Sequence, residues 1–193
     1  PTAYILRRGG VAYIPEDRLA RGLIPNFNLM ENSILGIHHS PDFTKDLGPL
    51  KRAFLDYGKI RNHARSLIQS YSIVAPSETV LVKYLSGGNL QRLLIAREFY
   101  KGARVLIAEQ PTRGLDVSAT DYVRRRIVDM RNRGAAVLLI SGDLDELFVL
   151  SDRMGVMYEG RFYGPFNTAE VDVETIGRLM VGQGEVSQEC EAS

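Results

Sequence analysis

Two short apolar runs separated by a helix-length segment constrain the fold of this chain more than any other feature. The runs are Val105–Ala108 and Val137–Ile140, and neither contains a charged or polar side chain. Continuous apolar runs of this length are typical of strands that are covered on both faces, as in parallel sheets. The segment 118–133 between them predicts a helix that ends at Gly134. The sequence therefore predicts a β-α-β unit, and with it an α/β fold built on a parallel sheet.

The remaining elements follow from apolar periodicity and turn residues. Upstream, the sequence predicts a strand over 11–14, a short helix capped by Asn28 and Glu31 that runs towards Gly36, and helices over 51–71 and 90–101. Downstream, it predicts a helix over 143–150, a hairpin of 154–158 with 161–163, a helix over 168–180 and a frayed tail over 183–193. The helix over 51–71 is expected to bury one face, formed by Ala53, Tyr57, Ile60, Ala64, Leu67 and Tyr71.

Composition excludes several classes of protein. With 45% hydrophobic and 24% charged residues, the 193-residue chain is expected to be globular, and a net charge of +1 gives no overall attraction to nucleic acid. Residues 51–104 carry ten Lys or Arg against three Asp or Glu, most simply the solvated face of a helix. The single cysteine, Cys190, excludes an intramolecular disulfide and a cysteine-based zinc site. The longest apolar run, Ala135–Ile140, is far shorter than the roughly 20 residues of a membrane span. Because the sequence begins with Pro1 and no Met, we expect a segment to precede it.

One motif, taken alone, suggests a phosphate-binding site. Leu85-Ser86-Gly87-Gly88-Asn89 stands where a loop enters a predicted helix. Free backbone N–H groups, the positive end of the helix dipole and a serine hydroxyl can surround a phosphate at such a junction. The plain alternative is a Ser/Gly helix start without a ligand, and an Leu-Ser-Gly-Gly sequence arises by chance in roughly one chain of this length in a hundred.

Further motifs follow in a fixed order. Glu109 and Gln110 end a predicted strand, the place where open parallel sheets bind ligands, and the segment 113–116 follows them. The next strand ends in the segment 140–143, and Glu16 follows the first strand. In this order and with the motif at 85–89, these segments resemble the ATP-binding cassette of ABC transporters, over residues 11 to 165.

The resemblance assigns roles to these segments. It implies that Leu85–Asn89 is the signature, 105–110 the Walker B strand, 113–116 the D-loop and 140–143 the H-loop region, with Glu16 at the Q-loop position. More narrowly, the chain looks like the second cassette of tandem ATPase subunits that power uptake of simple sugars or nucleosides. The features that it shares with those cassettes are Pro15–Arg18, Arg21–Leu23, Glu31-Asn32, the signature Asn89, Leu150–Arg153 and Val156–Gly160.

The fold implied by the resemblance is a partial P-loop NTPase (RecA-like) core with a parallel sheet plus the ABC helical subdomain. Residues 1–25 are expected to form the Q-loop strand and its loop, 26–102 the helical subdomain, 103–182 the second half of the core and 183–193 the tail. No Gly-x-x-x-x-Gly-Lys-Ser/Thr sequence occurs, so the Walker A strand and the N-terminal antiparallel sheet are expected to be absent. We therefore expect the isolated chain not to hydrolyse ATP.

Three catalytic positions depart from those of an active cassette. Glu109 replaces an Asp that holds Mg²⁺ through water, and Gln110 replaces the Glu that polarises the attacking water. Gly142 stands where the H-loop has a His. Each change has a plain structural explanation, but together they favour a degenerate hydrolytic site. Because cassettes pair head to tail, the resemblance implies that Ser86, Gly87, Gly88 and Asn89, with Glu16 and Asp116, bind ATP, the signature serving the partner cassette's nucleotide.

The resemblance implies a peripheral subunit on the cytoplasmic face of the membrane, with ATP and Mg²⁺ as cofactors. Its partners would be a second cassette, in the same chain or in a second copy, and integral-membrane permease subunits docked on the helical subdomain and the loop after Glu16. The alternative is a soluble ABC-type ATPase that acts on nucleic acid. Such proteins of the chromosome and repair type insert long coiled coils or zinc modules between the Q-loop and the signature, and the 70 residues from Glu16 to Ser86 contain no cysteine and only one helix-length heptad pattern. The basic segment 51–104 keeps that alternative open, and an inactive folding fragment is a third interpretation compatible with the first.

Overall fold

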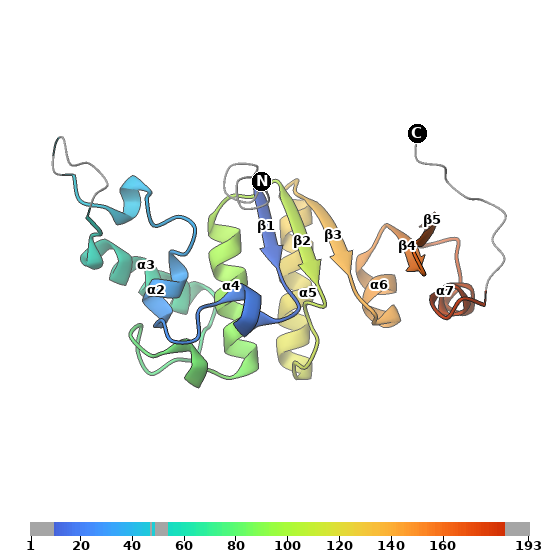
Figure 1. Ribbon diagram of the computed structural model, residues 1–193, viewed down its shortest axis with the longest axis horizontal. Coiled ribbons are helices and arrows are strands. Elements are labelled where there is room, and N and C mark those ends of the chain that lie inside the picture. Colours follow the sequence, from blue (N-terminus) through green and yellow to red (C-terminus); the bar gives the residue numbers. More distant parts are fainter. Residues whose placement is uncertain (1–9, 47, 49–53, 184–193) are drawn as a thin grey trace. The chain divides into compact units, whose positions relative to one another are not determined.

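A three-stranded parallel sheet organises the first of two units in the computed structural model, which describes residues 10–46, 48 and 54–183. Its strands are β1 (Val11–Ile14), β2 (Val105–Glu109) and β3 (Ala136–Ile140), in the order β1-β2-β3 (Figure 1). The helix α5 (Val117–Asn132) connects β2 to β3. The predicted β-α-β unit and the α/β class are therefore confirmed.

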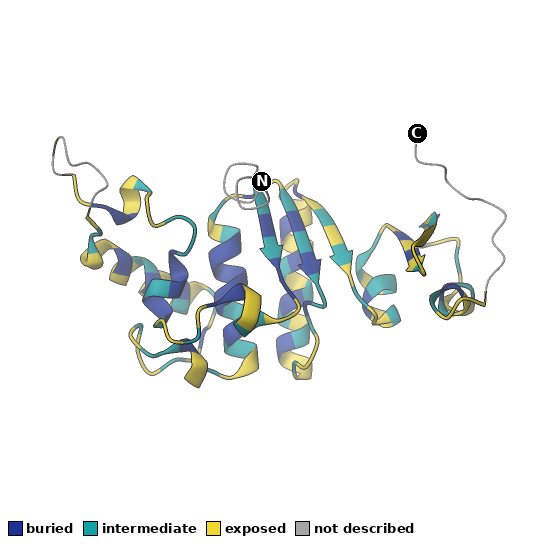
Figure 2. Cartoon of the chain, viewed as in Figure 1, coloured by how far each residue is buried: buried dark blue, intermediate teal, exposed yellow. Residues whose placement is uncertain are grey.

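The two faces of this sheet differ in cover. The register places Ala12, Leu106 and Val137 in one row, and Ala12 and Leu106 are fully buried. The helices α4 (Gly87–Tyr100) and α5 lie side by side along the sheet in Figure 1. On the opposite face, Leu138 is 54% and Ile140 46% exposed, and the alternation of burial along β3 is visible in Figure 2.

The prediction that both apolar runs are covered on both faces is therefore wrong for β3. In a strand, successive side chains point to opposite faces, and α5 covers only one face of β3. The apolar run Val137–Ile140 thus puts Val137 and Leu139 against the core and Leu138 and Ile140 at the surface.

The helix α4 is the centre of the first unit. Its residues Leu93, Leu94, Ile95 and Ala96 are all fully buried, so the helix is enclosed on every side along this stretch. Figure 1 shows α4 between the sheet and the pair α2 (Leu29–Ser33) and α3 (Tyr57–Ser70). It begins three residues earlier than predicted, at Gly87, because the two signature glycines already belong to its first turn.

The helices next to α4 follow the predicted pattern with two corrections. Asn28 and Glu31 form the predicted capping box at the start of α2, which ends at Ser33, before Gly36. The helix α3 begins at Tyr57, later than predicted, because Asp56 caps it, and the predicted positions 51–53 lie outside the described residues. In α3, Ile60, Ala64 and Leu67 are buried as predicted. Tyr57 is 58% exposed, contrary to prediction, because it stands in the first turn of α3, ahead of the first buried position. Short helical turns at Arg18–Gly22, Pro41–Phe43 and Val82–Tyr84 complete this region.

The second unit begins at Ser141 and has a small core of its own. It contains α6 (Leu144–Leu150), the antiparallel hairpin of β4 (Arg153–Tyr158) and β5 (Arg161–Asn167), and α7 (Val173–Met180). The predicted hairpin is confirmed, and its turn places Glu159 and Gly160 at positive φ. The last helix starts five residues later than predicted, because Asp172 caps it. Residues 184–193 of the predicted tail lie outside the described residues.

Among the described residues, no helix combines the length and the hydropathy that crossing a membrane requires.

The buried side chain of Asn32 holds the loop that leads into α2. Its Oδ1 accepts from the Ile24 N–H at 2.8 Å, and its Nδ2 donates to the carbonyls of Ile24, Phe27 and Asn28 at 3.0–3.2 Å. Asn32→Ala leaves the Ile24 N–H without its acceptor, whereas the three carbonyls keep backbone N–H partners, so we expect the free energy of unfolding to fall by about 1–3 kcal/mol. The measurement is urea unfolding, with the exposed Asn62→Ala of α3 as a control that changes stability by less than about 0.5 kcal/mol. A change as small as the control's for Asn32→Ala would contradict this role.

Candidate functional site

The signature segment forms the first turn of α4. Ser86 is the N-cap residue, and its carbonyl accepts the first helical hydrogen bond, from the Leu90 N–H at 2.9 Å. Its side chain makes no capping hydrogen bond to the backbone of the first turn. A Cβ on Gly88 would lie 3.4 Å from the Ala119 Cβ, so the first turn of α4 packs on the first turn of α5. The predicted loop-to-helix junction is present, with Ser86 and Gly87 exposed.

Asn89 ties the signature to the loop that follows α3. Its Oδ1 accepts from the Val74 N–H at 2.8 Å, and its Nδ2 donates to Ser86 Oγ at 2.9 Å. The side chain of Asn89 therefore bridges a backbone group of one segment and the hydroxyl of another.

The carboxyl ends of the strands carry Glu109 and Gln110. Tyr13 on β1 donates its hydroxyl to Glu109 Oε2 at 2.5 Å, so this carboxylate is held across two strands. Gln110 has a φ of +43°, and its N–H donates to the Ile140 carbonyl at 2.8 Å. A left-handed backbone at a residue other than glycine costs roughly 1 kcal/mol or more, which the surrounding structure must offset.

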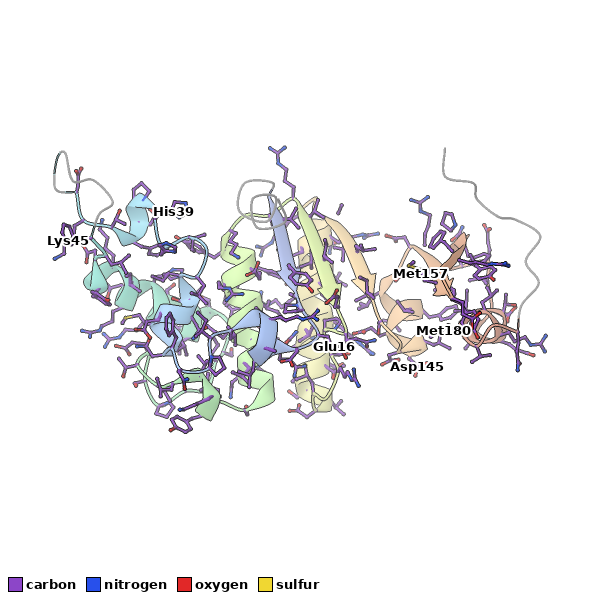
Figure 3. The ribbon with its side chains drawn as sticks, in the orientation of Figure 1. Glu16, His39, Lys45, Asp145, Met157 and Met180 are labelled. Atoms are coloured by element: carbon purple, nitrogen blue, oxygen red, sulfur yellow. The ribbon has the colours of Figure 1, made fainter. Side chains whose placement is uncertain are left out.

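The D-loop segment lies against the Q-loop position. Figure 3 shows Glu16 just beyond the carboxyl end of β1. Its carboxylate forms an ion pair with Arg113. Asp116 caps α5, its Oδ1 accepting from the Ala119 N–H at 2.9 Å. The fold thus brings together two predicted site segments that are almost 100 residues apart in the sequence.

Arg18 and Gln91 form a polar connection that sequence reasoning missed. Arg18 donates through Nε to Gln91 Oε1 and through Nη2 to the Arg113 carbonyl, both at 2.6 Å. Gln91, which is 1% exposed, donates to the Pro111 carbonyl at 2.8 Å. Burial lowers the pKa of Arg18 from its usual value. These bonds join the segment after β1, the signature helix and the D-loop, and the one available signal was the polar Gln91 among the apolar residues of a buried helix.

A pocket of about 470 Å³ lies beside β1. Its wall includes the buried carboxylate of Glu98, which accepts from Arg97 Nε at 2.9 Å, Lys101 Nζ at 2.6 Å and the Tyr13 N–H at 3.3 Å. Burial lowers the pKa of Lys101, and the charge of Glu98 partly opposes this shift. The pocket is lined by β1, the turn Arg18–Gly22 and the following residues to Ile24, the segment 35–37 and the last turns of α4.

Gly142 belongs to the second unit, whereas Glu109 and Gln110 belong to the first. It is exposed, and its neighbour Asp143 caps α6 through the Glu146 N–H at 3.2 Å. The functional roles assigned to Gly142 and to the other site residues remain predictions.

Comparisons with known proteins show which proteins this chain is similar to. No protein-family model matches the chain. It is 40% identical to the nucleoside import ATP-binding protein NupA of Lactococcus lactis subsp. cremoris, over 89% of this chain and 33% of that protein. It is 38% identical to the guanosine import ATP-binding protein NupO of Bacillus subtilis, over 92% of this chain and 34% of that protein. It is 34% identical to the ribose import ATP-binding protein RbsA 1 of Rubrobacter xylanophilus, over 94% of this chain and 35% of that protein.

The chain is a homologue of the ATP-binding proteins of ABC importers. It spans about a third of the length of these relatives. Its fold is similar to that of the ATP-binding cassette MJ0796, solved as a dimer in a post-hydrolysis state with ADP and Pi. That likeness has a TM-score of 0.60 at 19% identity and covers 81% of this chain and 63% of the other. The resemblance inferred from the motifs is confirmed at the level of the family, and the second-cassette detail stays a prediction.

The contact between Tyr13 and Glu109 gives a pH-dependent prediction for this cassette homologue. Burial first, and then the hydrogen bond and charge of Glu109, raise the pKa of Tyr13 above its usual 10.0. Because the folded-state pKa exceeds the unfolded one, the stability that Tyr13 contributes is complete below about pH 10 and is lost as pH rises through the folded-state pKa.

We expect Glu109→Gln to lower the pKa of Tyr13, because the hydrogen bond and the charge of Glu109 both raise it, while burial continues to raise it and Arg21 to lower it. The measurement is a pH titration by NMR of protein with ¹³C-labelled tyrosine rings, assigned with Tyr13→Phe. Glu159→Gln, in the hairpin turn of the second unit, is the control and should leave the Tyr13 titration unchanged. An unchanged or higher Tyr13 pKa in Glu109→Gln would exclude the contact.

Proposed function

We propose that this chain is part of the ATP-binding subunit of an ABC importer for simple sugars or nucleosides, peripheral on the cytoplasmic face of the membrane. The observation that carries the proposal is the signature turn, with an exposed serine hydroxyl and two glycines at the start of a 14-residue helix. The relatives are named as import ATP-binding proteins for nucleosides, guanosine and ribose, which supports the solute class.

The signature turn has the chemistry to complete an ATP site on a partner cassette. Backbone N–H groups at a helix N-terminus and the positive end of the helix dipole favour a phosphate. The absence of side chains at Gly87 and Gly88 lets a phosphate approach the backbone closely. Ser86 adds a hydroxyl that can donate to a phosphate oxygen. The partner cassette, in the same subunit or in a second copy, supplies the loop that wraps the nucleotide.

The chain's own hydrolytic position is degenerate in this proposal. Glu109 can contact Mg²⁺ through water with one carboxylate oxygen while Tyr13 occupies the other, so the residues fit the ion only in part. Gln110 offers a neutral amide that cannot accept a proton from water. Gly142 supplies no imidazole. Mg²⁺, bound with ATP, would neutralise phosphate charge at the assembled site.

The pocket beside β1 fits the docking of a permease segment. Its lining comes from the turn after Glu16 and from the helical region at 35–37, the two parts expected to form the docking groove. Arg21, Arg97 and Lys101 give its lining more positive than negative charge, since Glu98 is the single acidic residue there. An acidic or polar loop of the permease therefore has complementary charge.

Two substitutions separate the signature from the chain's own hydrolytic position. Gly88→Asp places a carboxylate where the phosphate is expected, so it should abolish ATP hydrolysis by the assembled importer. Gln110→Glu restores one general base but leaves Gly142 and Glu109 altered, and catalytic groups that act as a unit are strongly non-additive, so it should change turnover little. The measurement is steady-state ATPase activity of the importer reconstituted with its permease.

Gly88→Ala serves as the steric control for Gly88→Asp, because a Cβ there makes only ordinary contact with Ala119. The asymmetric-site proposal is wrong if Gly88→Asp retains most activity. It is also wrong if Gln110→Glu raises turnover about tenfold, which corresponds to roughly 1.4 kcal/mol in the barrier.

The docking proposal is tested at the rim of the pocket. Ala20 is exposed there, and Ala20→Trp fills part of the pocket without removing a hydrogen bond, because only its backbone is engaged. We expect co-purification with the permease and solute uptake to fall at least about tenfold, equivalent to about 1.4 kcal/mol of lost binding. The matched control is Ser66→Trp on the exposed face of α3, which should leave both unchanged. Normal assembly of the Ala20→Trp variant would place the permease elsewhere.

A further inference from the structure

The orientation of the Asn89 amide is determined by its neighbour. The Val74 backbone N–H can only donate, so the atom 2.8 Å from it is the amide oxygen. The amide nitrogen of Asn89 therefore faces Ser86 Oγ at 2.9 Å. Because this nitrogen carries only hydrogens, Ser86 Oγ accepts in the contact and cannot donate.

The loop that sets this orientation is itself anchored to α4. Arg92, three residues after Asn89 on the same helix, donates through Nη1 to the Ser72 carbonyl at 2.9 Å. Two side chains of α4 thus hold the segment 72–74 from the same side. The Val74 N–H is thereby kept in place for Asn89.

The hydroxyl proton of Ser86 is left for another acceptor. A serine hydroxyl has one proton and two lone pairs, and Asn89 takes one lone pair. An N-cap serine normally accepts from the backbone N–H groups of the first turn, but the Ser86 side chain makes no such bond. Its proton is consequently directed away from Asn89, and Ser86 is exposed at the start of the helix.

We propose that Asn89 is a positioning residue that turns the hydroxyl proton of Ser86 toward a phosphate oxygen of the nucleotide. The inference rests on the proposed function, in which the signature meets a partner cassette's ATP. A hydroxyl that donates to a phosphate forms a charge-assisted hydrogen bond. A side-chain acceptor at position 89 would take that proton and turn the oxygen lone pairs toward the anion. Asn89 prevents this, because the group it presents to Ser86 can only donate.

The key variant is Asn89→Asp, which keeps the size of the side chain and the oxygen that accepts from Val74. It replaces the donor facing Ser86 by an acceptor, so we expect the ATPase kcat/KM of the assembled importer to fall at least about tenfold, the scale of losing one hydrogen bond to a charged group. Asn62→Asp, the same exchange on the exposed face of α3, is the control for charge and is expected to leave activity unchanged. Thermal unfolding of both variants should match the unmodified protein.

A double-mutant cycle separates positioning from a general structural role. Ser86→Ala and Asn89→Ala should each reduce kcat/KM by about tenfold, whereas Asn89→Ala added to Ser86→Ala should cost less than about twofold more, because both act through one hydroxyl. A residue that merely held the loop would give losses that multiply.

The outcomes separate the proposed function of the signature turn from the role of Asn89. If Ser86→Ala retains full activity, the signature does not engage the nucleotide through this hydroxyl, and the proposed function of the turn fails together with the inference. If Ser86→Ala is impaired but the losses multiply in the double variant, or Asn89→Asp is fully active, the role of Asn89 is wrong while the proposed function stands.

Discussion

The burial of α4 on every side is the constraint on which the rest of the first unit depends. A run of four fully buried residues in its middle fixes the helix against the sheet, α5 and the pair α2 and α3. Protein interiors are close-packed, so a displacement of α4 would open cavities among all of these elements. The position of the signature turn is therefore set mainly by the packing of the middle of the same helix, and the loops around the turn contribute less to it.

A stack of cations and aromatic rings adds a second connection between the helices. The guanidinium of Arg126 on α5 lies 4.8 Å from the Tyr71 ring and 5.2 Å from the Tyr122 ring, and Arg92 on α4 lies 4.4 Å from the Tyr122 ring. Contacts of this kind are worth about 0.5–2 kcal/mol each, depending on how far they are desolvated. They join the end of α3, the signature helix and the helix that follows the D-loop, so the signature and the D-loop are supported by common residues.

The sequence predicted the elements well because their signals are local. A capping box needs only Asn28 and Glu31, and a parallel β-α-β unit needs only two apolar runs and a helix between them. Burial of β3 depended on what lies over its second face, which no local pattern encodes, and there the prediction was wrong. The network of Arg18 with Gln91 was missed for a similar reason, since its partners are backbone carbonyls of Pro111 and Arg113, and carbonyl positions follow from the tertiary fold.

The sequence named candidate site residues but did not predict the hydrogen bonds that connect the segments around them. Motif order pointed to the signature, the strand ends and the D-loop. The fold joins the segments at 16–18 and 111–113 through Gln91, which lies on the signature helix just after the signature itself. What the order could not supply is which side chains carry structural duties. Asp116 is engaged as a helix cap and Asn89 as a bridge, so each performs a local task whatever nucleotide chemistry is added to it.

Glu109 and Gln110, which replace the Asp and Glu of an active cassette, are each held by contacts with neighbouring segments. Glu109 is one methylene longer than Asp, and the Tyr13 hydroxyl on the neighbouring strand holds its extended carboxylate. Gln110 adopts a left-handed backbone, its N–H bonded to Ile140 and its carbonyl to the Arg113 N–H, so its backbone is satisfied while its side chain carries no charge. The loss of a general base at 110 and the retention of an acidic residue at 109 are thus each compatible with the contacts that the two positions make.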